Sequence, residues 1–146
     1  MYSIKNNTWT ALPDCPCNQK YSFATVHGDE IWIKSNSNNE LSAFNYKKKI
    51  HRLVDIQLPG GHSILISHAS ILYILTSGNM GIIKVSGLND KREKISTDYA
   101  IPNFNYTYSP YVFHNNMYHF VDCERNLLYF DVEKEQLFST PQKLNK

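Results

Sequence analysis

The chain has little that would carry it into a membrane or onto a nucleic acid. Its longest uninterrupted apolar run is the five residues Ile71–Leu75, far short of the roughly 20 that a membrane-spanning helix needs. An excess of one charge is also missing, because 15 Lys and Arg against 13 Asp and Glu leave a formal net charge of +2. Without a basic field, we expect neither nucleic acid nor a membrane surface as the partner.

Cysteine is scarce and does not form a disulfide framework. The three cysteines, Cys15, Cys17 and Cys123, are an odd number, and residues 1–7 lack the basic-then-apolar order of a secretory signal. Both features favour a reducing compartment, so the expected location is intracellular, in the cytoplasm with the nucleus as the alternative. The Cys15-Pro16-Cys17 pair offers two ligands where a closed zinc site needs four, so we interpret it as a loop and predict no metal.

Apolar and aromatic residues are plentiful enough for a folded core, at 42% and 13% of the 146 residues. This length fits one compact unit. No segment repeats apolar residues with the period of a helix, whereas short alternating runs recur along the chain. The pattern therefore predicts an all-β fold in which helices are absent or incidental.

Three stretches of about 40 residues repeat one order of features. Each begins with Tyr or His followed by Ser, reaches a His five residues later, and continues through two short β-type runs, a polar turn and a last strand that closes on proline. Each unit predicts a four-stranded antiparallel meander. The last strands are expected at residues 53–59, 95–102 and 137–141, and the charged runs 47–49 and 91–94 in the hairpins that precede them.

The N-terminal segment matches the end of such a unit. Trp9 follows Tyr2 by seven residues, just as Leu137 follows Phe130. The chain is therefore expected to start in the middle of a repeat and to divide into 1–13, 21–59, 62–102 and 108–141. A meander of this length hides both apolar faces only when it stacks against copies of itself, so the repeats predict the blades of a β-propeller.

These features resemble the kelch repeat of intracellular β-propellers. Residues 6–13 are similar to the N-x-W-x-x-L-P part of that motif, Ile31–Ile33 and Leu72–Ile74 to its second strand, and Phe130-Asp131 to its aromatic-Asp pair, although the family's double glycine is missing. The resemblance implies a propeller fragment of about three kelch-like blades plus the last strand of a preceding blade, within a larger protein. Exposed blade faces would make the isolated chain self-associate.

The leading functional hypothesis is a non-catalytic protein–protein interaction module. In a four-stranded blade, the loops between strands four and one and between strands two and three emerge at one face, and their Asn, Ser and Tyr content is typical of recognition surfaces. The resemblance to kelch proteins implies substrate recognition for a cullin ubiquitin ligase, next to a BTB or F-box domain. The predicted partner-binding residues are Tyr21, Tyr108, Lys20, Asn36, Asn38, Asn79 and Arg125.

The alternative is part of a propeller enzyme with a metal or small-molecule site on the channel axis, as in galactose oxidase, which the family resemblance includes. His27, His68 and His114 recur once per unit, so they would lie on successive blades rather than around one ion, and we interpret them as turn residues. Sequence motifs for a P-loop, a nucleophile elbow or a zinc protease are missing. We therefore predict no enzyme activity, no catalytic residues and no cofactor.

Overall fold

The described part of the chain is built from β-strands. The computed structural model describes residues 1–16, 22–35, 37, 39–56, 58, 61–78, 81–86, 91–95, 101 and 111–143, and every regular element among them is a strand. These residues therefore confirm the all-β prediction. They contain no helix that is long and apolar enough to cross a membrane.

One two-stranded hairpin and three four-stranded sheets follow one another along the chain. Each strand pairs antiparallel with its neighbours in sequence, which confirms the predicted meanders. The hairpin consists of β1 (Tyr2–Ser3) and β2 (Thr8–Trp9). The first sheet contains β3 (Ser22–His27), β4 (Glu30–Ser35), β5 (Leu41–Asn45) and β6 (Ile50–Leu53); the second contains β7 (Ser63–His68), β8 (Ile71–Thr76), β9 (Ile82–Ser86) and β10 (Lys91–Ile95); the third contains β11 (Val112–His114), β12 (Met117–Val121), β13 (Asn126–Asp131) and β14 (Gln136–Lys143).

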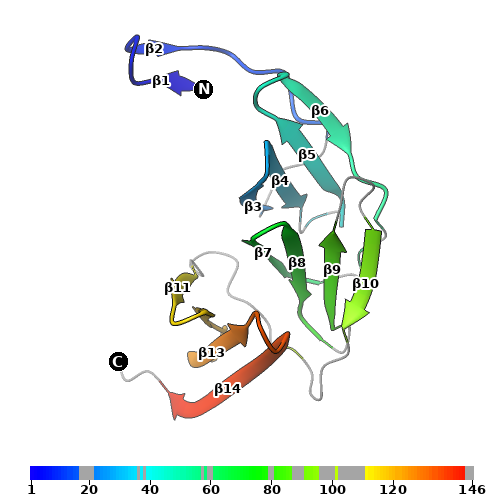
Figure 1. Cartoon of the computed structure of the whole chain (residues 1–146), viewed down its shortest axis with the longest axis vertical. Helices are drawn as coiled ribbons and strands as arrows, with labels where there is room; N and C mark the ends of the chain where they lie inside the picture. The colour runs from blue at the N-terminus through cyan, green and yellow to red at the C-terminus, as the bar shows by residue number, and fades with distance from the viewer. Residues whose placement is uncertain are drawn as a thin grey trace.

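The sheets lie one after another along an open arc (Figure 1), and none of the described sheets closes on itself. The first strand of each four-stranded sheet, β3, β7 or β11, lies on the concave side, and the fourth strand, β6, β10 or β14, lies on the outer side. Because consecutive strands are antiparallel, their connections alternate between two rims. The second-to-third and fourth-to-first connections share one rim, which we call the loop rim; the other two kinds of connection form the turn rim.

The apolar core fills the two spaces between the sheets. Alternate residues of a strand point to opposite faces, so the second sheet sends Ile64 and Tyr73 towards the third sheet and Leu65 and Leu72 towards the first. Both faces of the second sheet are thereby covered, and this explains why β8 is an almost continuous apolar run rather than an alternating one.

A common register relates the hairpin to the three sheets. In every case a third-strand residue pairs with the residue seven positions later in the fourth strand; these pairs are Tyr2 with Trp9, Phe44 with His51, Val85 with Arg92, and Phe130 with Leu137. The fifth position of this interval has a left-handed backbone at Asn7, Lys49 and Glu135, with φ of 50°, 57° and 53°. The hairpin thus has the geometry of the third and fourth strands of a sheet.

Two of the predicted fourth strands were placed too late in the sequence. β6 ends at Leu53 and β10 spans Lys91–Ile95, so the charged run 91–94 lies in a strand rather than in the hairpin before it. Lys49, whose backbone is left-handed, ends a four-residue turn at 46–49, and this turn is shorter than the sequence pattern predicted. β10 is an outermost strand, where charged side chains are compatible with strand structure and discourage pairing with other chains.

Candidate functional site

The loop rim is where the sequence placed a partner-binding surface. Tyr21, Tyr108, Lys20, Asn36, Asn38 and Asn79 lie outside the described residues, so their predicted roles stay predictions. Arg125 is described, and it is exposed at the tip of the turn between β12 and β13 with a φ of 68°. Its backbone N–H donates to the carbonyl of Asp122 at 3.2 Å, which closes the turn beneath it.

A buried carboxylate, which the sequence reasoning missed, organises that turn. Asp122 accepts hydrogen bonds from the backbone N–H groups of Glu124 at 2.9 Å and Asn126 at 2.8 Å, and from the Asn126 side-chain amide at 2.7 Å. An Asp that bonds the backbone two residues on is the signature of an Asx turn. The turn therefore holds Arg125 in one backbone conformation at the surface.

In the first sheet, a buried lysine organises the equivalent connection. Lys34 has no exposed surface, and its ammonium donates to the Ser35 carbonyl at 2.5 Å and to Asn39 Oδ1 at 3.5 Å. The Ser35 N–H donates to the Glu40 carbonyl at 2.9 Å, which closes the loop at its base. Burial lowers the pKa of Lys34 to about 8, because removal from water disfavours the charged form. The lysine had no role in the sequence prediction, since a polar residue in a strand is ordinarily exposed.

Beside this loop the rim carries a groove of about 510 Å³. The groove combines two carboxylates, Glu40 and Asp55, with the apolar side chains of Val54 and Ile56. Its size is within the range of ordinary ligand clefts. The groove therefore has both acidic and apolar residues in its lining, which consists of Asn39, Glu40, Leu41, Leu53, Val54, Asp55, Ile56 and Leu58.

The second sheet reaches the same rim through a set of short polar contacts. Ser77 donates its N–H to the His62 carbonyl at 2.9 Å, and its hydroxyl oxygen accepts the His62 N–H at 3.2 Å. Gly78 and Ile101 exchange two backbone hydrogen bonds of 2.7 and 3.0 Å. Hydrogen bonds from buried or paired polar groups thus fix the described loop-rim connections of all three sheets.

The turn rim carries a larger groove, of about 800 Å³, that the sequence reasoning did not anticipate. Arg52 donates to both carboxylate oxygens of Glu30, at 3.1 and 2.8 Å, and its guanidinium lies 5.1 Å from the centre of the Trp32 ring. At the edge of the groove, Lys47 forms an ion pair of 2.7 Å with Asp29. The two carboxylates in the lining of this groove, Asp29 and Glu30, are therefore each paired with a basic side chain.

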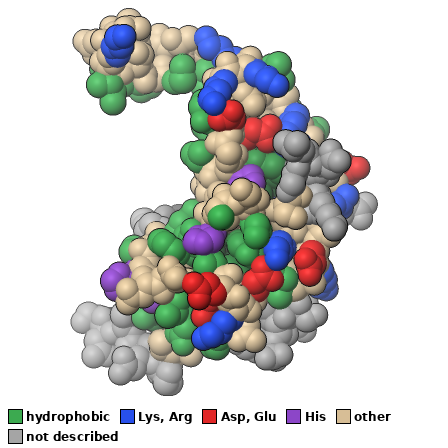
Figure 2. All heavy atoms as spheres, viewed as in Figure 1, with side chains coloured by type: hydrophobic (Ala, Val, Ile, Leu, Met, Phe, Trp, Pro, Cys, Tyr) green, Lys and Arg blue, Asp and Glu red, His purple; other side chains and the backbone are tan. Residues whose placement is uncertain are grey.

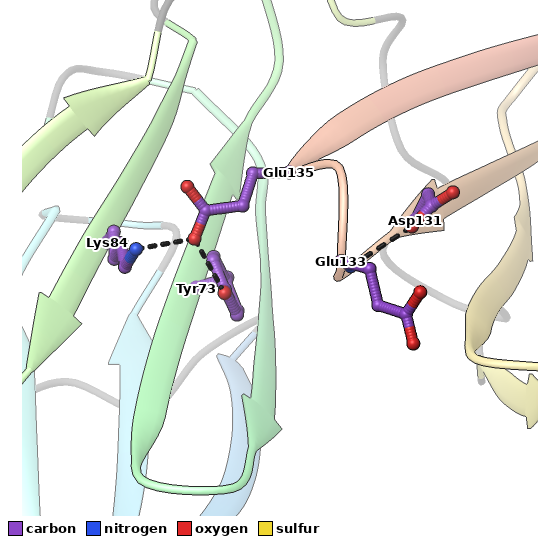
Figure 3. A network of polar contacts seen from close by, with 5 residues as sticks. All are labelled: Tyr73, Lys84, Asp131, Glu133 and Glu135. Carbon is purple, nitrogen blue, oxygen red and sulfur yellow. Dashed lines mark hydrogen bonds and ion pairs between the residues drawn. The ribbon is translucent and has the colours of Figure 1, made fainter.

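A polar network also connects the second and third sheets (Figure 3). Glu135, from the turn between β13 and β14, accepts hydrogen bonds from Lys84 Nζ at 2.5 Å and from the Tyr73 hydroxyl at 2.9 Å. The Lys84 ammonium lowers the pKa of Glu135, while burial, followed by the nearby carboxylate, raises the pKa of Tyr73. Asp131 Oδ1 accepts the N–H groups of Glu133 and Lys134 at 3.0 and 3.1 Å, which shapes the turn that presents Glu135. The arrangement is an inter-sheet clamp.

The repeated histidines end strands, whereas the sequence interpretation placed them in turns. His27, His68 and His114 are the last residues of β3, β7 and β11, because the two-residue turns begin one position later. His27 Nδ1 lies 3.0 Å from the Ser67 hydroxyl, and His68 Nδ1 lies 3.4 Å from the Tyr118 hydroxyl, so each histidine contacts a strand of the next sheet. Among the described residues, no group of three or more His, Cys, Asp or Glu side chains converges to hold a metal.

The cysteine pair is only partly described. Cys15 Sγ lies 3.6 Å from the Ser42 hydroxyl, which places the segment after β2 against the first sheet, and Cys17 lies outside the described residues. Figure 2 shows the surface seen along the axis of the arc, with Lys, Arg, Asp and Glu side chains mixed rather than gathered by sign.

Comparison with known proteins adds no family to this description. Neither a family model nor a curated protein matches the chain.

Proposed function

We propose that the chain is a non-catalytic protein–protein interaction domain of the β-propeller type, with degenerate kelch-like repeats. Three observations support the propeller arrangement: four-stranded meanders in sequence order, first strands on the concave side of an arc, and apolar cores between the faces of successive sheets. The common seven-residue register supports a single repeating unit.

The proposed binding surface is the loop rim around the groove of Glu40 and Asp55. The observation that carries this assignment is the set of polar contacts that fixes the loops, through Lys34, Ser77 and Asp122. Loops held in one conformation lose little conformational entropy when a partner binds, so more of the contact free energy appears as affinity. The groove favours a partner segment with basic and apolar side chains, because the exposed carboxylate of Asp55 lies beside apolar side chains in its lining.

The resemblance to kelch proteins extends this proposal to substrate recognition for a cullin ubiquitin ligase. A role in ubiquitination would say what happens to the bound partner, and it does not change which surface of the chain binds that partner. Ubiquitination of the loop-rim partner in cells with and without the chain tests the extension separately, since equal ubiquitination would refute it while leaving the loop-rim assignment intact.

The two rims offer a matched pair of exposed carboxylates for testing the binding surface. A photo-crosslinking amino acid is placed at Asp55 on the loop rim in one variant and at Asp29 on the turn rim in another. The proposal predicts that a cellular partner is crosslinked from position 55 and not from position 29. The purified partner should then bind Asp55→Lys about tenfold more weakly than Asp29→Lys. Crosslinking from position 29 alone, or equal affinities, would refute the loop rim as the binding surface.

A further inference from the structure

The outer edge of β6 is open and lacks the features that protect the other outer edges. β6 lies on the outer side of the arc (Figure 1) and pairs with β5 alone among the described strands, while Ile50 and Leu53 at its two ends are 59% and 56% exposed. β10 reads Lys-Arg-Glu-Lys-Ile and β14 contains Pro141, and both features discourage pairing with another chain. β6 reads Ile-His-Arg-Leu, without a charge run or a proline. Because the sheets stack face to face, a further sheet at either end of the arc would leave this edge open.

The backbone of β6 presents hydrogen-bonding groups to this edge. The Val54 N–H donates to the Leu41 carbonyl at 2.8 Å, so these two residues are a hydrogen-bonded pair between β5 and the end of β6. Pairs of the two kinds alternate along an antiparallel ladder, so Leu53 and His51 belong to non-hydrogen-bonded pairs. It follows that the N–H and C=O groups of Leu53 and His51 face away from β5, towards the outer edge.

The open edge is continuous with the loop-rim groove. Leu53 is the last residue of β6 and also lines the groove, next to Val54 and Asp55. Asp55 is exposed, and no hydrogen bond or ion pair joins its carboxylate to another residue in the described part of the chain. Both carboxylates of the turn-rim groove, by contrast, are paired with a basic side chain. A segment that pairs with β6 therefore meets an uncompensated negative charge at the loop-rim end of the strand.

We propose that the partner bound at the loop rim adds an extended segment to the outer edge of β6 as a fifth, antiparallel strand. Two residues of the segment exchange backbone hydrogen bonds with Leu53 and His51. An apolar side chain lies opposite Leu53, and a basic side chain lies at the end of the segment nearest Asp55. The inference rests on the proposed function, and it names the conformation and the chemistry of the partner segment.

A second copy of the chain is a poorer occupant of this edge. Two β6 strands that pair antiparallel through both His51 and Leu53 place Arg52 of one copy directly opposite Arg52 of the other. Like charges directly opposite each other destabilise a pair of strands. A partner segment with a neutral side chain opposite Arg52 avoids this repulsion.

The probe is an acetylated hexapeptide, Arg-Thr-Val-Thr-Val-Thr, with a fluorophore at its C-terminus. In the antiparallel register its valines lie opposite Leu53 and His51, and its arginine lies at the Asp55 end. We expect saturable binding of one peptide per chain by fluorescence anisotropy. Two control peptides should bind severalfold more weakly: one with the reversed sequence, which moves the arginine away from Asp55, and one N-methylated at its first valine, which cannot donate to the Leu53 carbonyl.

Three variants of the chain test the edge and the charge separately. Leu53→Pro removes an N–H that faces the edge and should weaken peptide binding about fivefold, the effect of one backbone hydrogen bond. Ser139→Pro is the matched control, because Ser139 pairs with Leu128 in β14 as Leu53 pairs with Ser42 in β6, and it should leave binding unchanged. Asp55→Asn should weaken binding severalfold at low salt and less at high salt. Retained strand signals for β7–β9 by NMR show that the sheets remain folded.

Three results would overturn the proposal. The first is the absence of saturable binding at peptide concentrations of about 1 mM. The second is equal binding of the unmodified and the N-methylated peptide, which would indicate that side chains alone hold the segment. The third is a dimer, seen by light scattering without peptide, that Leu53→Pro dissociates, because this would assign the edge to a second copy of the chain.

Crosslinking from position 55 keeps the proposed function separate from this inference. A partner that is crosslinked at position 55 and binds the wild-type chain and Leu53→Pro equally would refute strand addition, while the loop rim would remain the binding surface.

Discussion

Lys34 makes a direct prediction about how stability changes with pH. The pKa of this buried lysine is about 8 in the folded chain against an ordinary value of 10.5. Between these two pH values the unfolded chain binds more protons than the folded chain, so the free energy of unfolding rises with pH. From about pH 7 to about pH 9.5 the rise amounts to about 2 kcal/mol, since each unit of pKa difference corresponds to about 1.4 kcal/mol.

The assay is urea unfolding of the wild-type chain and of Lys34→Met at several pH values across this range. Methionine keeps most of the side-chain volume and removes the ammonium. The unfolding free energy of the variant should therefore change by less than about 1 kcal/mol over this pH range, against the rise of about 2 kcal/mol in the wild-type chain. Lys48→Met is the control, because Lys48 is exposed in the turn after β5 and should retain the wild-type slope. A stability difference between wild type and Lys34→Met that stays constant with pH would refute the argument that burial governs this lysine.

Three further predictions concern the clamp, the Asx turn and the inter-sheet core. Glu135→Gln should destabilise the chain by about 1 kcal/mol at neutral pH. Because the pKa of Glu135 is lower in the folded chain than its ordinary value of 4.5, the wild-type chain is the more stable one above pH 4.5 and loses this extra stability as the pH falls through the folded pKa. Urea midpoints measured down to acid pH would show this loss. Asp122→Ala should cost about 2 kcal/mol and speed amide exchange at 124–126, and unchanged exchange would contradict the role given to this carboxylate. Phe130→Ala should cost about 3–5 kcal/mol by leaving a cavity, whereas Phe113→Ala, on a partly exposed ring, should cost less than half as much in the same calorimetric series.

The strand order could be predicted from the sequence because it depends on local patterns. Alternating runs and short polar breaks reveal strands and turns without any knowledge of what packs against them. The seven-residue spacing of Tyr2 and Trp9 likewise follows from a four-residue turn with one left-handed position. Where the local pattern was misleading, as at Lys91–Ile95, the reason was that an outermost strand contacts water and so resembles a turn in composition.

The polar contacts that organise the sheets could not be predicted in this way. Tyr73 and Glu135 are 62 residues apart, and their contact depends on how the third sheet packs against the second. Lys34 is buried because the connection after β4 folds back over it, which no period in the sequence records. Of the seven partner-binding residues that the sequence suggested, only Arg125 lies in the described part of the chain, and its position at an exposed turn on the loop rim agrees with the expected placement.

The face-to-face packing of successive sheets gathers the connections between strands into two rims, and the proposed binding surface depends on it. The most direct test is an NMR measurement of nuclear Overhauser effects between aromatic rings of different sheets in the full chain. Tyr73 of β8 and Phe130 of β13 have ring centres 5.0 Å apart at an angle of 66°, so cross-peaks between their ring protons are predicted. Aromatic cross-peaks confined to residues of the same sheet would show that successive sheets do not pack face to face.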